Sequence, residues 1–184
     1  MSDAAKLPST EWLEGYLFSQ NVNNNDITDS RCRIILDFTL LWNLFESQLL
    51  SKASDRIDPE YKELSIAKQR ELLSRLFIVS PDALDKVSSF LKTRYIGGPD
   101  CPPQVPLFSL YERDKGKEEQ ESIRRLLSSP KDEGDVKQAC YMIVYRYRNN
   151  LFHGNKDLSI IWEETEIFHY ACDYLIDCLT NNLD

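Results

Sequence analysis

Glycine and long hydrophobic runs are scarce in this sequence. It has only 6 glycines in 184 residues, and its apolar residues recur at helical spacing. Both features favour an all-α fold over a sheet protein. With 42% of the residues hydrophobic, the chain can bury a core, which excludes global disorder. The length predicts one domain over 1–184, with a flexible tail at 1–9.

Basic residues are also in deficit. Lys and Arg number 22 against 30 Asp and Glu, which gives a formal net charge of -8. This balance excludes a protein that coats nucleic acid through bulk electrostatics. A local basic pocket remains compatible with it, because a site responds more strongly to nearby charges than to distant, screened ones.

Signals for metals and disulfides are absent from the sequence. The 5 cysteines form no C-x-x-C pair and their count is odd, so we expect buried free thiols in a reducing cytosol. The sequence has only 2 histidines, and no carboxylates stand near them at ligand spacing. We therefore expect neither a metal nor another cofactor.

Targeting and membrane segments are not apparent either. The N-terminal tail is polar and lacks an apolar segment, so we expect no signal peptide. Asp37, Asn43 and Glu46 interrupt the longest apolar stretch, around 34–50, so it does not predict a membrane span. The expected location is the cytoplasm.

Apolar spacing and turn residues together predict a bundle of helices. The expected helices cover about 30–54, 59–77, 80–96, 115–128, 135–153 and 158–179. Gly97 and Gly98 should end the third helix, and the Pro-rich segment 97–110 should be an irregular connection. A break is expected at 130–134. The short link 155–157 predicts that the last two helices pack antiparallel.

The segment Tyr145–Gly154, which reads YRYRNNLFHG, is the most informative in the chain. On a helical wheel one side is a core stripe, made of Val136, Cys140, Ile143, Val144, Tyr147 and Leu151. The opposite side carries Tyr145, Arg148, Asn149, Phe152 and His153. Because this second side is too aromatic for a plain solvated surface, it predicts a partner, either a second copy or a nucleobase.

The order Arg148, Asn149, three further residues and His153 resembles the signature of the HEPN superfamily. The resemblance covers this short motif, with a looser likeness in the apolar helix that holds residues 40–46. It implies a HEPN-like antiparallel helical bundle with additional short helices. It also implies a homodimer whose two copies of the motif build one composite active site.

These residue types suit RNA cleavage without a metal. Attack by a ribose 2′-hydroxyl on the neighbouring phosphate needs a proton acceptor, a proton donor and positive charge for the phosphorane. His153 titrates near neutral pH, and Arg148 grips phosphate oxygens in a forked geometry. Asn149 can orient either group. Since one His is few for two proton transfers, a symmetric dimer would supply the second.

Flanking residues complete the candidate site. Arg146, Tyr145 and Lys156 lie beside the motif and are candidates for substrate binding. Glu46 is a further candidate, either as an acid that supports the site or as a solvated charge. The tryptophans are expected in the core rather than as base-stacking platforms.

Three functions stay open at this point. The first is a metal-independent endoribonuclease, a toxin or defence effector, for which we expect an antitoxin or regulatory partner. The second is a non-catalytic HEPN module that binds nucleotide or RNA, or other proteins. The third is a helical adaptor in which His153 and Gly154 only end a helix, since Gly adopts the left-handed cap and His favours the negative end.

Overall fold

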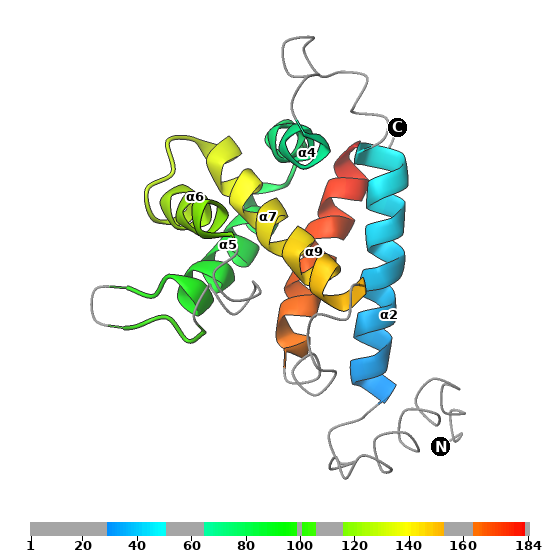
Figure 1. Ribbon diagram of the computed structural model, residues 1–184. Coiled ribbons are helices and arrows are strands. Elements are labelled where there is room, and N and C mark those ends of the chain that lie inside the picture. The colour runs from blue at the N-terminus through cyan, green and yellow to red at the C-terminus, as the bar shows by residue number, and fades with distance from the viewer. Residues whose placement is uncertain (1–28, 51–64, 99–100, 106–115, 153–163, 183–184) are drawn as a thin grey trace.

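The computed structural model describes residues 29–50, 65–98, 101–105, 116–152 and 164–182 (Figure 1). These residues form helices and contain no β-strand, which confirms the all-α prediction for this part of the chain. The elements are α2 (Asp29–Leu44), the π-helical η2 (Phe45–Leu50), α4 (Ile66–Ser74), α5 (Pro81–Tyr95), α6 (Lys117–Ser128), α7 (Glu133–Phe152) and α9 (Thr165–Asn182).

Helix α7 lies at the centre of the arrangement, and α4, α5 and α6 pack against it. Every residue of the stretch 138–144 is buried, so the middle of this helix has no outward face. The predicted division into a core side and an exposed side therefore holds only at the C-terminal end, where Phe152 is 46% exposed. The expected exposed side is wrong for the middle of α7, because α2 and α4 also pack against that part of the helix.

Helix α9 crosses α7 with the opposite chain direction, and the link predicted at 155–157 lies outside the described residues (Figure 1). The ring of Tyr147 contacts Phe168 near one end, and the Tyr174 hydroxyl donates to the Lys137 carbonyl near the other. Helices α2 and α9 run side by side in Figure 1, and Phe38 packs edge-on against Phe168 between them. The core is thus continuous from α2 through α9 to α7.

Local sequence signals set several helix ends. Ser80 caps α5 by accepting the Ala83 backbone N–H, and Pro81 occupies the first turn, as predicted. Gly97 ends the helix with φ +74°, a conformation that costs other residues energy. By contrast, α7 begins at Glu133, inside the predicted break at 130–134, because the Asp132 side chain accepts the backbone N–H of Asp135.

The first long helix departs from the predicted form at its end. Its α-helical part stops at Leu44, and a π-helical turn continues to Leu50. The predicted apolar stripe is nevertheless in the core, with Phe38, Trp42 and Phe45 fully buried. The remainder of the predicted helix, at 51–54, lies outside the described residues.

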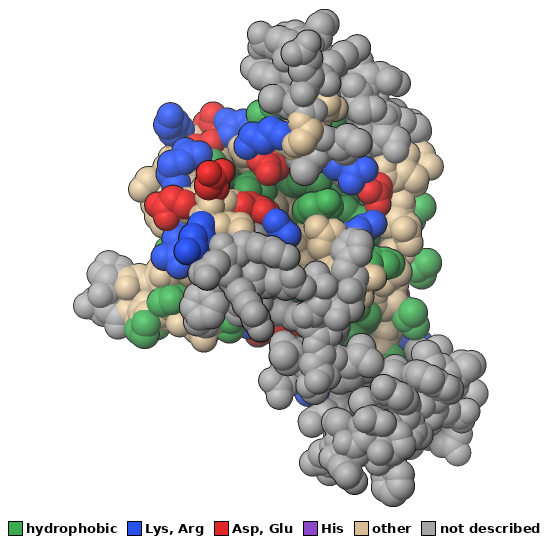
Figure 2. Space-filling view, in the orientation of Figure 1, with side chains coloured by type: hydrophobic (Ala, Val, Ile, Leu, Met, Phe, Trp, Pro, Cys, Tyr) green, Lys and Arg blue, Asp and Glu red, His purple; other side chains and the backbone are tan. Residues whose placement is uncertain are grey.

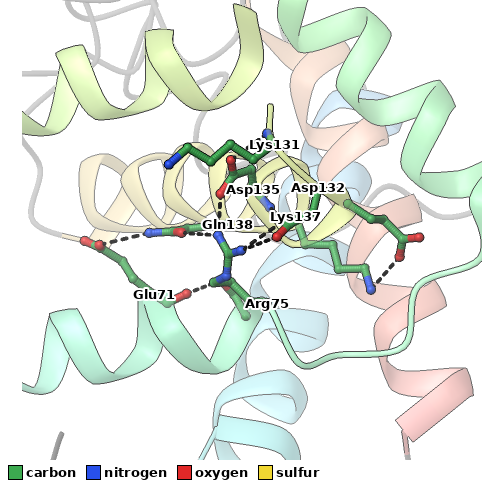
Figure 3. A network of polar contacts seen from close by, with 9 residues as sticks. Glu71, Arg75, Lys131, Asp132, Asp135, Lys137 and Gln138 are labelled. Carbon is green, nitrogen blue, oxygen red and sulfur yellow. Dashed lines mark hydrogen bonds and ion pairs between the residues drawn. The ribbon is translucent and has the colours of Figure 1, made fainter. Parts of the chain in front are cut away.

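A charged network joins α4 to the start of α7 (Figure 3). The Arg75 guanidinium donates to Asp135 at 2.5 Å and to Asp132 at 2.9 Å. It also donates to Gln138 at 3.2 Å, and the Gln138 amide reaches Glu71 on α4. Because Asp135 is buried, this network fixes the angle at which α4 meets α7.

Four of the five cysteines are buried, which confirms the prediction for Cys140, Cys172 and Cys178. Burial raises the pKa of each of these three thiols to about 12.

We expect the thiol reagent DTNB to modify only Cys101 rapidly in the native protein, because the other thiols are buried and the thiolate is the reactive form. Counting thiols by absorbance before and after adding guanidinium checks this. A Cys101→Ser variant should lose the rapid phase, and rapid modification of more than one thiol would contradict the prediction.

Candidate functional site

The C-terminal turn of α7 carries Arg148 and Asn149, the two described members of the predicted catalytic motif. Both side chains are half-buried, and the helix ends at Phe152. The other predicted members, His153 and Lys156, lie outside the described residues. The candidate site can therefore be described around the guanidinium of Arg148.

The Arg148 guanidinium is fixed from two sides. Its Nη1 donates to the Asn149 side-chain oxygen at 3.2 Å, and its central carbon lies 4.9 Å from the centre of the Phe152 ring. A cation at this distance over an aromatic face is held by electrostatic attraction. Its Nε is buried and has no hydrogen-bond partner within the described part of the chain. The charged end is thus oriented, and the side chain as a whole is 24% exposed.

Glu46 lies next to this guanidinium. The closest pair of atoms, Glu46 Oε2 and Arg148 Nη2, is 3.6 Å apart, too long for a good hydrogen bond but close enough for strong electrostatic attraction. The carboxylate is held instead by Trp42, whose indole N–H donates at 3.0 Å, and by Arg70 at 2.8 Å. Glu46 is therefore part of an ion-pair cluster at the site, and the interpretation as a merely solvated charge is wrong.

The local backbone explains why Glu46 reaches this position. It is the second residue of the π-helical turn η2, directly after the fully buried Phe45. Single π-helical turns inside longer helices occur frequently at functional sites. Here the turn presents a carboxylate toward α4 and α7 while its neighbour stays in the core.

Arg70 on α4 was not among the predicted site residues. Its side chain is 26% exposed, similar to the 25% of Glu46 and the 24% of Arg148, so solvent reaches all three groups. Two guanidiniums around one carboxylate leave the cluster with one net positive charge. No sequence signal predicts Arg70, because its contact with Glu46 depends on how two distant helices pack.

A buried tyrosine hydroxyl lies close to the same charges. Tyr141 is 2% exposed, and its hydroxyl has no hydrogen-bond partner among the residues that the structure describes. Burial raises the pKa of Tyr141, while the nearby Arg70 lowers it and Glu46 raises it. An unpaired buried polar group is uncommon in proteins, so it marks this corner of the core as incompletely satisfied.

Two other predicted residues, Arg146 and Tyr145, contact side chains other than Arg148. Arg146 forms an ion pair with Glu119 on α6, with a 3.1 Å hydrogen bond from its Nε. Tyr145 packs in an aromatic layer, stacked 5.9 Å from Tyr141 and tilted 5.8 Å from Trp42. In the structure Arg146 therefore forms a salt bridge with α6, and Tyr145 packs against other aromatic rings. Their predicted role in substrate binding is untested.

A second polar cluster lies deeper, between α5, α7 and the start of α9. Arg94 is 3.6 Å from Glu164, and both are buried. The hydroxyls of Tyr95 and Tyr147 are hydrogen-bonded, and burial raises the pKa of Tyr95 to about 12. Because its charges are paired and shielded from solvent, this cluster joins the helices and does not form an open binding site.

The described residues hold no group of three or more His, Cys, Asp or Glu side chains arranged to bind a metal ion. None of their helices combines the length and the apolar character that crossing a bilayer requires. Comparisons with protein-family models, with curated proteins and with solved structures each found no significant match.

Proposed function

We propose that the chain is a metal-independent endoribonuclease of HEPN type, which acts as a toxin or defence effector. The observation that carries this proposal is the Arg148 guanidinium, which is oriented by Asn149 and Phe152 on a side chain that is 24% exposed. A cation held in place before the substrate arrives stabilises charge that develops on a phosphorane without a cost of reorganisation.

In the proposed reaction the ribose 2′-oxygen attacks the adjacent phosphorus, and the bond from phosphorus to the 5′-oxygen breaks. The proton of the 2′-hydroxyl passes to a base, and a second proton passes to the leaving 5′-oxygen. His153 performs these transfers, together with its counterpart from a second copy of the chain. Arg148 neutralises the phosphorane and Asn149 orients the reacting groups. The products are a 2′,3′-cyclic phosphate and a 5′-hydroxyl.

The dimer in this proposal has support at the same end of α7. Phe152 is 46% exposed and contacts the Arg148 guanidinium, so an apolar surface adjoins the proposed phosphate site. An isologous interface around a two-fold axis would bring two such ends together. A nuclease of this kind harms its host, so we also propose that an antitoxin or regulatory partner restrains it.

A non-catalytic HEPN module that binds nucleotide, RNA or another protein is the second candidate. The observation in its favour is Glu46, a carboxylate only 3.6 Å from the Arg148 guanidinium. This carboxylate partly neutralises the guanidinium and so weakens the stabilisation of a phosphorane, which disfavours catalysis. The formal net charge of -8 acts in the same direction.

Incubation of the purified protein with end-labelled RNA in EDTA tests the proposal. We expect fragments that end in cyclic phosphate, and we expect His153→Ala to abolish them because the proton transfers lose their carrier. His169→Ala, which removes the exposed histidine on α9, serves as the matched control and should cut at the parental rate. Saturable RNA binding without any cleavage would favour the second candidate. Cleavage by His153→Ala at the parental rate would exclude His153 as the catalyst.

A further inference from the structure

Arg70 and Arg148 approach one carboxylate from different helices. Glu46 Oε1 lies 2.8 Å from Arg70 on α4, and its Oε2 lies 3.6 Å from Arg148 on α7. The indole N–H of Trp42 fixes the carboxylate between them. The two guanidiniums are therefore held on one patch, and neither is more than about a quarter exposed.

Among the described residues of the cluster, the charges do not balance. Two guanidiniums, those of Arg70 and Arg148, face the one carboxylate of Glu46, and this excess of one positive charge matches the single negative charge of a phosphodiester. A guanidinium has several N–H donors in a planar fork, and one oxygen atom does not occupy them. The Tyr141 hydroxyl and the Arg148 Nε are buried beneath this patch and have no hydrogen-bond partner among the described residues, so the donors that face a ligand are those at the ends of the two guanidiniums.

We propose that Arg70 is a second phosphate-binding residue, coupled to Arg148 through Glu46, so that α4 and α7 together bind one phosphodiester of single-stranded RNA. This inference rests on the proposed RNA site at Arg148 and adds a residue from another helix to it. Glu46 is a positioning residue, since it holds both guanidiniums toward the same point and itself contacts no substrate.

The distribution of surface charge explains why two arginines would be needed. On the face drawn in Figure 2, Lys and Arg side chains are interspersed with Asp and Glu over the described part, with no broad area of one sign. A chain with net charge -8 gains little from long-range attraction of RNA. Short-range contacts from fixed guanidiniums must then supply the affinity. Two arginines that both hydrogen-bond one phosphate give a higher affinity than a single arginine does.

The test measures binding of a fluorescent 2′-O-methyl RNA tetranucleotide by anisotropy, because this probe cannot undergo 2′-hydroxyl attack. We expect Arg70→Gln and Arg148→Gln each to weaken binding about tenfold in the full chain. Each should also lower the slope of log affinity against log salt by about 0.7. Arg33→Gln on α2, thirteen residues and about 20 Å before Glu46 along the helix, is the matched control and should bind as the parent.

A double variant separates direct contact from indirect charge effects. If Arg70 contacts the phosphate, Arg70→Gln combined with Glu46→Gln should bind about tenfold more weakly than Glu46→Gln alone. Equal affinity of these two variants would overturn the proposal, because Arg70 would then only neutralise Glu46. Arg70→Lys keeps the charge without the fork and should bind about threefold more weakly. Parental affinity of Arg70→Lys would also overturn the proposal.

The outcomes distinguish this inference from the proposed function. Weak binding by Arg148→Gln together with full affinity of the Arg70 variants would refute only the role of Arg70. Full affinity of Arg148→Gln, or a parent that does not bind the probe, would refute the RNA site itself. Circular dichroism melting of each variant shows that its fold is intact before its affinity is compared.

Discussion

Arg148→Lys is expected to lower the rate of RNA cleavage by about 100-fold, nearly as much as Arg148→Ala. The physical reason is the geometry around the guanidinium, because Asn149 and the Phe152 ring orient a planar fork. Lysine places one compact ammonium on a flexible stem and makes no forked contact with phosphate oxygens. Conserving the charge should therefore conserve little of the activity.

Single-turnover cleavage of labelled RNA, with enzyme in excess, measures this prediction. Arg33→Lys on α2 is the matched control, because Arg33 is exposed and lies thirteen residues, about 20 Å, before Glu46 along the helix. We expect a rate within about threefold of the parent, because this variant keeps an exposed charge far from the site. If Arg148→Lys cleaved as fast as the parent, only the positive charge would matter, and the argument from orientation would be wrong.

Helix ends were predictable from the sequence where the signals were local. Ser80 and Pro81 start α5, and Gly97 ends it at a positive φ, because these residues act on their own backbone. The opposite chain directions of α7 and α9 agree with the expected pair, while the link predicted at 155–157 lies outside the described residues. The start of α7 was predicted two residues late, since the cap formed by Asp132 lies within a segment rich in turn-forming residues.

The candidate site was predictable only in part. Arg148 and Asn149 were found from a motif along one helix, and the structure places both at the C-terminal turn of α7. The contact between Glu46 and Arg70 could not be predicted, because it depends on tertiary packing and on a π-helical turn that has no apolar period of its own. Helical periodicity indicates which face is buried, but it does not reveal which helix supplies the neighbour.

Arg75→Ala is expected to destabilise the fold by about 2 kcal/mol, the range found for lost hydrogen bonds to charged groups. Arg75 holds Asp135, whose side chain is 7% exposed, and it also donates to Gln138 (Figure 3). Without the guanidinium, a shielded carboxylate loses its counter-charge and α4 loses its main polar link to α7. Urea unfolding followed by circular dichroism measures the change. Lys86→Ala, which removes an exposed pair with Asp173, is the control and should leave the midpoint unchanged.

The pH dependence of the free energy of unfolding shows whether Arg75→Ala destabilises the fold through lost charge or through lost packing. The backbone N–H of Lys131, followed by the Arg75 guanidinium, lowers the pKa of Asp135 below its usual value. A depressed carboxyl pKa contributes stability that is present above the unfolded-state value of about 3.9 and is lost as the pH falls through the folded value. The free energy of unfolding of the parent should therefore exceed that of Arg75→Ala most near neutral pH, and the difference should narrow as the pH falls below the unfolded-state value of about 3.9 and through the lowered folded value. A difference of equal size near neutral pH and at low pH would mean that Arg75 stabilises the junction of α4 and α7 by packing alone.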